Sequence, residues 1–221
     1  MRRIEKLATP DILRDNADNW THELLAAPVG SDGFNAIQSR YRHREIREQL
    51  RLETSGKCAY CESLIGAVAY PHIEHMRPKH IHRELTFHWI NLTLACPVCN
   101  VNKGNDDATD ENFVNPYSDD TDSRFRFIAG FMTCQPDDLP ARNMVNWLDL
   151  NRGDLVIQRT EVIERVQSIY LEAIALERGA RRAFIRHSIA RMTRAGSTYS
   201  RVAEDFAALC DVNYSDALDL D

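Results

Sequence analysis

Two Cys-x-x-Cys pairs constrain this chain more than any other feature. They are Cys58 with Cys61 and Cys96 with Cys99, and the 34 residues from 62 to 95 separate them. Two thiolates in one tight turn reach a single ion, and four close the tetrahedral shell of a structural Zn²⁺. This interval is longer than in a simple zinc ribbon, so an inserted segment is expected. A redox dithiol is the alternative, but it would leave one pair without a role.

Composition places this zinc site in a soluble globular protein. Hydrophobic residues make up 43% of the chain, and no apolar run is long enough for a membrane span or a signal peptide. We therefore expect a cytoplasmic protein, with thiols available for metal and no membrane partner. The other cysteines, Cys134 and Cys210, stand alone and are expected to be small buried residues. A net charge of −6 argues against a broadly basic surface, although arginines cluster from Arg40 to Arg51.

Helical patterns lie on both sides of the cysteine-rich segment. Thr9 and Pro10 form a typical helix start, and the apolar spacing after them predicts a helix to about residue 27. Apolar residues from Phe34 to Leu50 predict a second helix that ends by Gly56. Helical spacing returns from residue 162 to 189. The fold class predicted is α+β and mainly α, with a helical region at 1–56, a zinc-organised module at 57–105, and an acidic loop followed by helices at 106–221.

Strand signals are short and few. The stretches "AVAYPHI" (67–73) and "LTLA" (92–95) are β-prone and fall inside the cysteine-rich module. The stretch "RFRFIAG" (124–130) alternates apolar and polar residues like a strand. Between them, residues 106–122 are acidic and rich in turn residues, which predicts a surface loop.

The segment "HIEHMRPKH" (72–80) lies between the cysteine pairs and carries Glu74 next to His75. A histidine can take a proton from water, and an adjacent carboxylate on the other side of a strand can bind a hard divalent cation. Hydrolysis of a phosphodiester needs both functions. An isolated Glu-His pair is more often a solvated surface feature, but the flanking cysteine pairs favour the catalytic interpretation.

Together, "CAYC", "IEHMRPKH" and "NLTLACPVCNVNKGN" resemble the ββα-metal finger of HNH endonucleases, in the subtype with a four-cysteine zinc site. By this resemblance His75 is the general base and Glu74 a metal ligand, where the family more often has Asp. Asn91 orients the histidine and braces the finger. Asn100 is the second ligand, where many members have His, and its amide oxygen still suits a hard cation. Lys103 matches the motif lysine, which would touch phosphate or shape the helix start.

The resemblance implies a catalytic Mg²⁺ or other divalent cation besides the zinc. Arg77, Lys79 and His80 lie next to the proposed phosphate position and are the expected substrate contacts. DNA is the expected substrate. The same finger cutting RNA, including tRNA, is an alternative, because the chemistry does not choose the sugar. A zinc-stabilised module that binds a partner or nucleic acid without cutting is a second alternative.

Segments outside the finger extend the resemblance. "MRRIEKLATPDIL", "FVNP" and "LDLNRGDLVIQR" (148–159) are similar to the longer HNH proteins of Septu-type and retron-associated anti-phage systems. Such proteins act beside an ABC-type ATPase and, in retron systems, a reverse transcriptase with its DNA product. This chain has no Gly-x-x-x-x-Gly-Lys-[Ser/Thr] motif, so the ATPase would be a separate partner.

Overall fold

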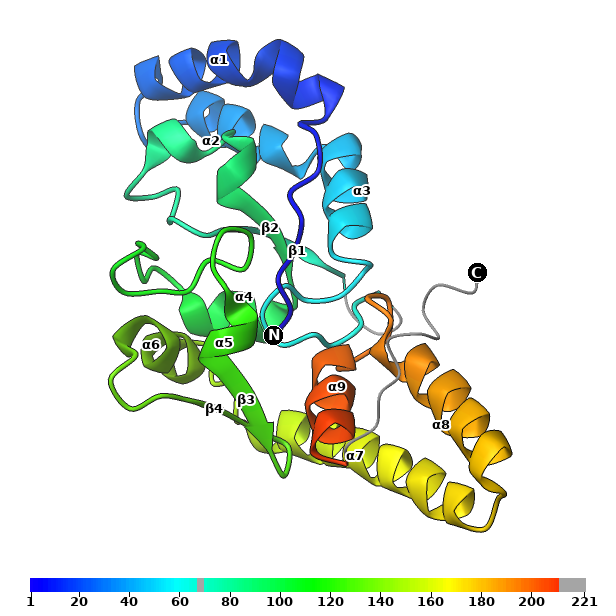
Figure 1. The fold of residues 1–221 in the computed structure, drawn as a ribbon. Coiled ribbons are helices and arrows are strands. Elements are labelled where there is room, and N and C mark those ends of the chain that lie inside the picture. The colour runs from blue at the N-terminus through cyan, green and yellow to red at the C-terminus, as the bar shows by residue number, and fades with distance from the viewer. Residues whose placement is uncertain (67–69, 211–221) are drawn as a thin grey trace.

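The computed structural model describes residues 1–66 and 70–210. Figure 1 shows the N-terminal helices at one end of the molecule, the C-terminal helices at the other and a small hairpin between them. The α-helices are α1 Asp11–Ala26, α2 Asp32–Gln38, α3 Arg44–Glu53, α4 Pro97–Lys103, α5 Thr121–Arg124, α6 Leu139–Trp147, α7 Gly153–Ile174, α8 Arg178–Thr193 and α9 Ser200–Leu209. The strands are β1 His72–His75, β2 Leu92–Ala95, β3 Phe125–Ile128 and β4 Phe131–Cys134, and short 3₁₀ helices cover Ser39–Arg42, Arg83–Leu85 and Trp89–Asn91. The predicted mainly helical α+β class is confirmed.

The first predicted helix is α1, which begins directly after Pro10 and buries Leu13 and Leu24. The second predicted helix is wrong as a single element, because the chain divides it into α2, a 3₁₀ turn and α3. His43 causes the break: its ψ of 144° leaves the helical region, and its side chain accepts a hydrogen bond from the Glu45 amide to start α3. Ser55 and Gly56 follow the C-cap of α3 at φ values of 53° and 71°, and the Gly56 amide donates to the Arg51 carbonyl at 2.8 Å to close the helix end.

The central hairpin forms the predicted finger. β1 and β2 are antiparallel, and Glu74 pairs with Thr93 while His75 pairs with Leu92. Directly after β2, Cys96 caps α4 and Pro97 occupies its first turn. The β-prone stretch from 67 to 73 lies partly outside the described residues, which omit 67–69.

The chain after the finger holds a second hairpin and the C-terminal helices. β3 confirms the predicted strand near 124–130, whereas β4 was not predicted and pairs with it. Gly130 joins the two strands at a φ of 84°, and a Cβ there would lie 2.7 Å from the Thr160 hydroxyl of α7. The hairpin turn therefore packs closely against α7. The segment from 106 to 122 is mostly irregular, as expected for a loop, with α5 beginning at Thr121.

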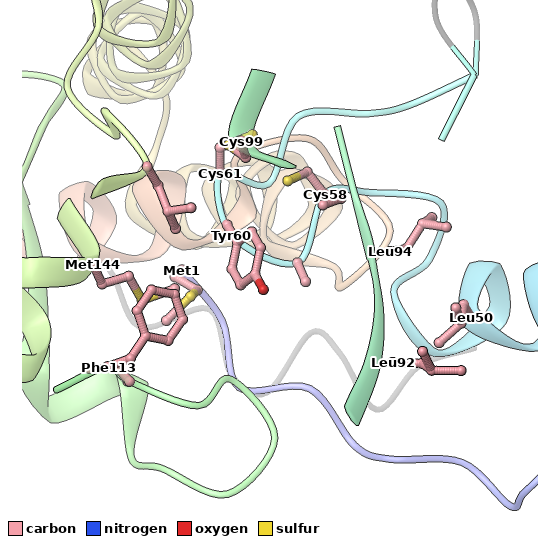
Figure 2. Packing of buried hydrophobic residues seen from close by; sticks show 14 of the residues in the cluster. Met1, Leu50, Cys58, Tyr60, Cys61, Leu92, Leu94, Cys99, Phe113 and Met144 are labelled. Carbon is pink, nitrogen blue, oxygen red and sulfur yellow. The ribbon is translucent and has the colours of Figure 1, made fainter. Parts of the chain in front are cut away.

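Two groups of buried apolar residues hold these elements together. The larger cluster includes residues from all three regions of the chain, among them Leu24, Leu94 and Phe125. Figure 2 shows part of it, where the rings of Tyr60 and Phe113 meet edge to face with centroids 5.9 Å apart. The smaller cluster lies among α7, α8 and α9. Among the described helices, none has the length and apolar character needed to cross a membrane.

Candidate active site

The four predicted cysteines form one cluster. The sulfur atoms of Cys58, Cys61, Cys96 and Cys99 lie within 4.8 Å of one another, and the Cys61 and Cys96 sulfurs are 3.9 Å apart. Tetrahedral zinc with Zn–S bonds of about 2.3 Å separates its sulfurs by about 3.8 Å. The donor set and its spacing therefore fit a structural Zn²⁺. Figure 2 shows three of these side chains beside the buried core.

Local turns point the thiols toward one another. In the first pair, the Cys58 amide donates to the Ser63 carbonyl at 2.9 Å, and the Glu62 amide donates to the Cys58 carbonyl at 3.0 Å. In the second pair, Cys96 is the N-cap of α4 and its sulfur accepts a hydrogen bond from the Cys99 amide at 3.4 Å. The knuckle turn and the helix start thus present two sulfurs each to a common point.

Two arginines from the far end of the chain face this cluster. Arg152 donates to the Cys99 sulfur at 3.7 Å from just before α7. Arg159 is fully buried, and burial lowers its pKa while the nearby Cys61 thiol opposes that change. Zn²⁺ bound by four thiolates would be net anionic, and these cations would compensate its charge. Neither arginine was predicted to have this role, because the cysteine spacing does not indicate which later segment packs against the cluster.

A cavity of about 350 Å³ lies at the open side of the hairpin. Its lining contains five of the predicted site residues, namely Glu74, His75, Lys79, His80 and Asn100. The N-terminal helical region contributes Gln38 and Tyr41, which the sequence analysis did not select. The finger and the helical region before it thus build the cavity together.

His75 lies in the wall of this cavity and is 5% exposed. Its Nε2 is 3.0 Å from the Thr86 carbonyl oxygen. A carbonyl oxygen only accepts hydrogen bonds, so Nε2 carries the proton and Nδ1 is the free base. Burial, aided by the charge of Lys79, lowers the pKa of His75 to about 3, and the imidazole is therefore neutral at pH 7. The ring of Tyr41 meets it edge to face at 4.6 Å.

Glu74 and Lys103 form a buried ion pair under the cavity. The Lys103 ammonium is 3.0 Å from Glu74 Oε1 and donates to the His75 carbonyl at 3.2 Å. Burial raises the pKa of Glu74, and the charge of Lys103 opposes this rise. Lys103 is 1% exposed and lies in the last turn of α4, so it supports the β1 end from inside and does not line the cavity.

Glu74 and Asn100 supply the oxygens that a hard cation would need. Glu74 Oε1 is buried, and its one close partner is the Lys103 ammonium at 3.0 Å, whose geometry does not meet that of a hydrogen bond. Asn100 donates from its amide nitrogen to His72 Nδ1 at 2.9 Å, and this directs its oxygen elsewhere. A carboxylate and an amide oxygen in one polar cavity suit a Mg²⁺-like ion.

Asn91 ties down the loop that leads out of β1. Its side-chain oxygen accepts from the Arg77 amide at 2.8 Å, and its nitrogen donates to the carbonyls of Arg77 and Leu85 at 3.0 and 3.2 Å. Asn91 is 5% exposed and does not line the cavity. Its contacts are those of a brace, one of the two functions expected from the motif.

Arg77 is the one expected substrate contact that lies outside this cavity lining. Its guanidinium binds Asp107 through two contacts of 3.0 and 3.1 Å, and His82 contacts the same carboxylate at 2.8 Å. These partners, with Arg77 first, lower the pKa of Asp107 to about 2. Arg77 therefore connects the loop after β1 to the segment after α4.

Comparison with known proteins agrees with this geometry. Residues 58–106 match the family model described as HNH endonuclease. The Septu protein PtuB of Bacillus mycoides (strain KBAB4) is 24% identical over 158 residues, which are 58% of this chain and 54% of that protein. The aligned part thus spans about half the length of this relative. The chain therefore contains an HNH endonuclease domain and is a distant homologue of Septu protein PtuB.

Proposed function

We propose that this protein is a metal-dependent endonuclease that hydrolyses phosphodiester bonds of DNA. The observation that carries the proposal is that a neutral His75, whose Nε2 lies at the Thr86 carbonyl, lines the same cavity as Glu74 and Asn100. A base and a cation site next to each other are the two requirements of phosphodiester hydrolysis. The four-cysteine zinc site would hold this arrangement together without taking part in the reaction.

The proposal gives each side chain a role. Nδ1 of His75 takes a proton from a water molecule, whose oxygen attacks the phosphorus as the bond to the leaving oxygen breaks. Glu74 and Asn100 would hold a divalent cation, which neutralises charge on the phosphate and on the leaving oxygen. Lys79 and His80 line the same cavity and would contact the phosphate. The expected products carry 5′-phosphate and 3′-hydroxyl ends.

The biological setting follows from the resemblance to Septu-type proteins. We propose that the nuclease acts in the cytoplasm as the effector of an anti-phage complex with an ABC-type ATPase. Where the system includes a retron, a reverse transcriptase and its DNA product would join the complex. Co-purification of the full-length protein with the ATPase encoded beside it tests this assembly, and elution of the two proteins in separate peaks would contradict it.

The activity itself is tested with plasmid DNA and total RNA, each with and without Mg²⁺, using the protein together with its partner. We expect Mg²⁺-dependent cleavage of DNA that His75→Ala reduces by at least about 10²-fold, because the general base is lost. His88→Ala is the matched control, since His88 is exposed and lies outside the cavity lining. Cleavage of RNA alone would favour the RNA alternative, and cleavage of neither would favour a non-catalytic binding module.

A further inference from the structure

A second cavity, of about 410 Å³, adjoins the one that holds His75. The two share Tyr41, Ile73, Lys79 and Asn100 in their linings. The new side chains in the second lining are Arg42, Arg47, Pro71 and His72. A continuous depression therefore runs from the proposed catalytic cavity to the start of α3.

This second cavity is lined by cations without counterions. Its lining contains Arg42, Arg47 and Lys79 but no carboxylate. Within the described part of the chain, no Asp or Glu pairs with Arg42 or Arg47, and both are exposed. Neighbouring arginines differ: Arg40 is 2.6 Å from Glu23, and Arg44 is 3.1 Å from Glu48. Arg42 and Arg47 thus bring positive charge to the cavity that no carboxylate of the described residues pairs with.

Two of these cations lie over one aromatic ring, and the third is bonded to the backbone beside it. The guanidinium carbon of Arg42 lies 5.5 Å from the ring centre of Tyr41, and the Lys79 ammonium lies 5.4 Å from it. Arg47 donates to the Arg42 carbonyl at 3.3 Å. Like charges placed this close repel one another unless an anion lies between them. A polyanion bound in the depression would remove that repulsion.

We infer that Arg42, Arg47 and Lys79 form a binding site for the phosphates of the nucleic-acid strand that flank the bond to be cut. This inference rests on the proposed function, because the depression ends in the proposed catalytic cavity. Arginines that contact phosphate set the register of a strand and carry no sequence information. The site would therefore position the strand over His75, and the same contacts would serve DNA and RNA.

Binding is measured with full-length His75→Ala protein and fluorescent single-stranded DNA and RNA of one sequence, so that cleavage does not interfere. We expect Arg42→Ala with Arg47→Ala to weaken binding of both single strands roughly tenfold and to lower the magnitude of the slope of log K against log salt by about 1.4. The control is Arg44→Ala with Arg51→Ala, which also removes two positive charges, here from α3 and outside both cavities. Arg47→Lys, with Arg42 unchanged, should bind both strands nearly as tightly as the parent protein, because contact with phosphate needs only the positive charge.

The outcomes separate this site from the proposed activity. Equal weakening by the control pair, or unchanged binding after Arg42→Ala with Arg47→Ala, would overturn the site even if the wild-type protein cuts DNA. Failure of the wild-type protein to cut either nucleic acid would overturn the proposed function, while the binding data would still decide on the site. Matching circular dichroism and melting temperatures among the variants would exclude loss of fold as the cause.

Discussion

The imidazole of His75 is a base whose pKa lies far from its ordinary range. The sequence pattern identified the Glu-His pair and its chemistry, because a motif specifies residue types at fixed spacing. It could not predict that the Thr86 carbonyl selects the tautomer, since that contact depends on how the loop after β1 folds back. The motif also could not predict that the Lys103 side chain is buried. It specifies a position on α4, but not which side of that helix faces the interior.

The lowered pKa of His75 predicts how stability depends on pH. Between pH about 3 and about 6.5, the unfolded chain binds a proton at this residue that the folded protein does not. The free energy of unfolding should therefore fall by up to about 1.4 kcal/mol per pH unit as the pH drops through this window, with no contribution from His75 above it. Urea unfolding across the window should be less steep with pH for His75→Asn than for the wild type. Equal slopes would contradict the buried neutral histidine.

Removing the brace at Asn91 should destabilise the finger. Asn91→Ala leaves the Arg77 amide and the carbonyls of Arg77 and Leu85 without their partner. We expect a loss of about 2–3 kcal/mol in the free energy of unfolding, because buried polar groups become unsatisfied. Asn102→Ala is the control, since that exposed side chain makes a single bond to Leu148 and should matter less. Urea unfolding compares the two variants, and equal losses would contradict the bracing role.

At the scale of elements, the sequence patterns that predicted helices correctly were those in which neighbouring residues determine where the helix starts. The apolar spacing suffices to predict α1, although Pro10 is its N-cap where Thr9 was expected. Cys96 with Pro97 suffices to start α4. The break at His43 was not predicted, because the apolar periodicity of the sequence continues through the turn that separates α2 from α3. β4 was missed because only the pairing with β3 and the packing on α7 make a strand of "FMTC". Long-range contacts decided both cases, and a single sequence does not display them.

The turn between β3 and β4 provides a test of that packing. Gly130→Ala places a Cβ 2.7 Å from the Val156 carbonyl and the Thr160 hydroxyl, and it also strains a backbone at a φ of 84°. Gly30→Ala is the matched control, because Gly30 has a φ of 81° but no atom within 4 Å of the added carbon. We expect Gly30→Ala to cost about 1–2 kcal/mol and Gly130→Ala clearly more, measured by urea unfolding. Equal losses would mean that α7 moves away freely.

At the scale of the whole molecule, the zinc site joins regions that are distant in sequence. Its ligands come from the finger, while Arg152 and the buried Arg159 come from the start of α7. In the described part of the chain, Nε and Nη2 of Arg159 have no hydrogen-bond partner. A buried arginine with so few partners is unfavourable unless an anionic group lies near it. The sequence indicated the zinc site but not this connection, because nothing in the cysteine spacing reveals which helix returns to cover it.

Exchange of Arg159 should separate the effects of charge from those of packing. Arg159→Met removes an incompletely paired buried charge, so the metal-free protein should lose little stability or gain some. The zinc-loaded protein should lose stability, because its anionic centre loses a compensating cation. The gap in melting temperature between the zinc-loaded and chelator-treated forms should therefore narrow. The exposed Arg165→Met is the control and should leave the gap unchanged; a constant gap in Arg159→Met would refute the compensation.

The order of these groups along the chain also has a consequence for synthesis in the cell. The four cysteines of the cluster all precede residue 100, whereas the arginines near them are at 152 and 159. At about 5–20 residues per second, the ribosome adds the arginines about 3–12 s after the last cysteine. If the cysteine thiolates of the nascent chain bind zinc in this interval, the anionic zinc-thiolate cluster would already be formed when α7 leaves the ribosome and packs against it. Zinc supplied during cell-free translation should therefore recover more folded protein than the same zinc added afterwards, and equal recovery would show that the docking order does not matter.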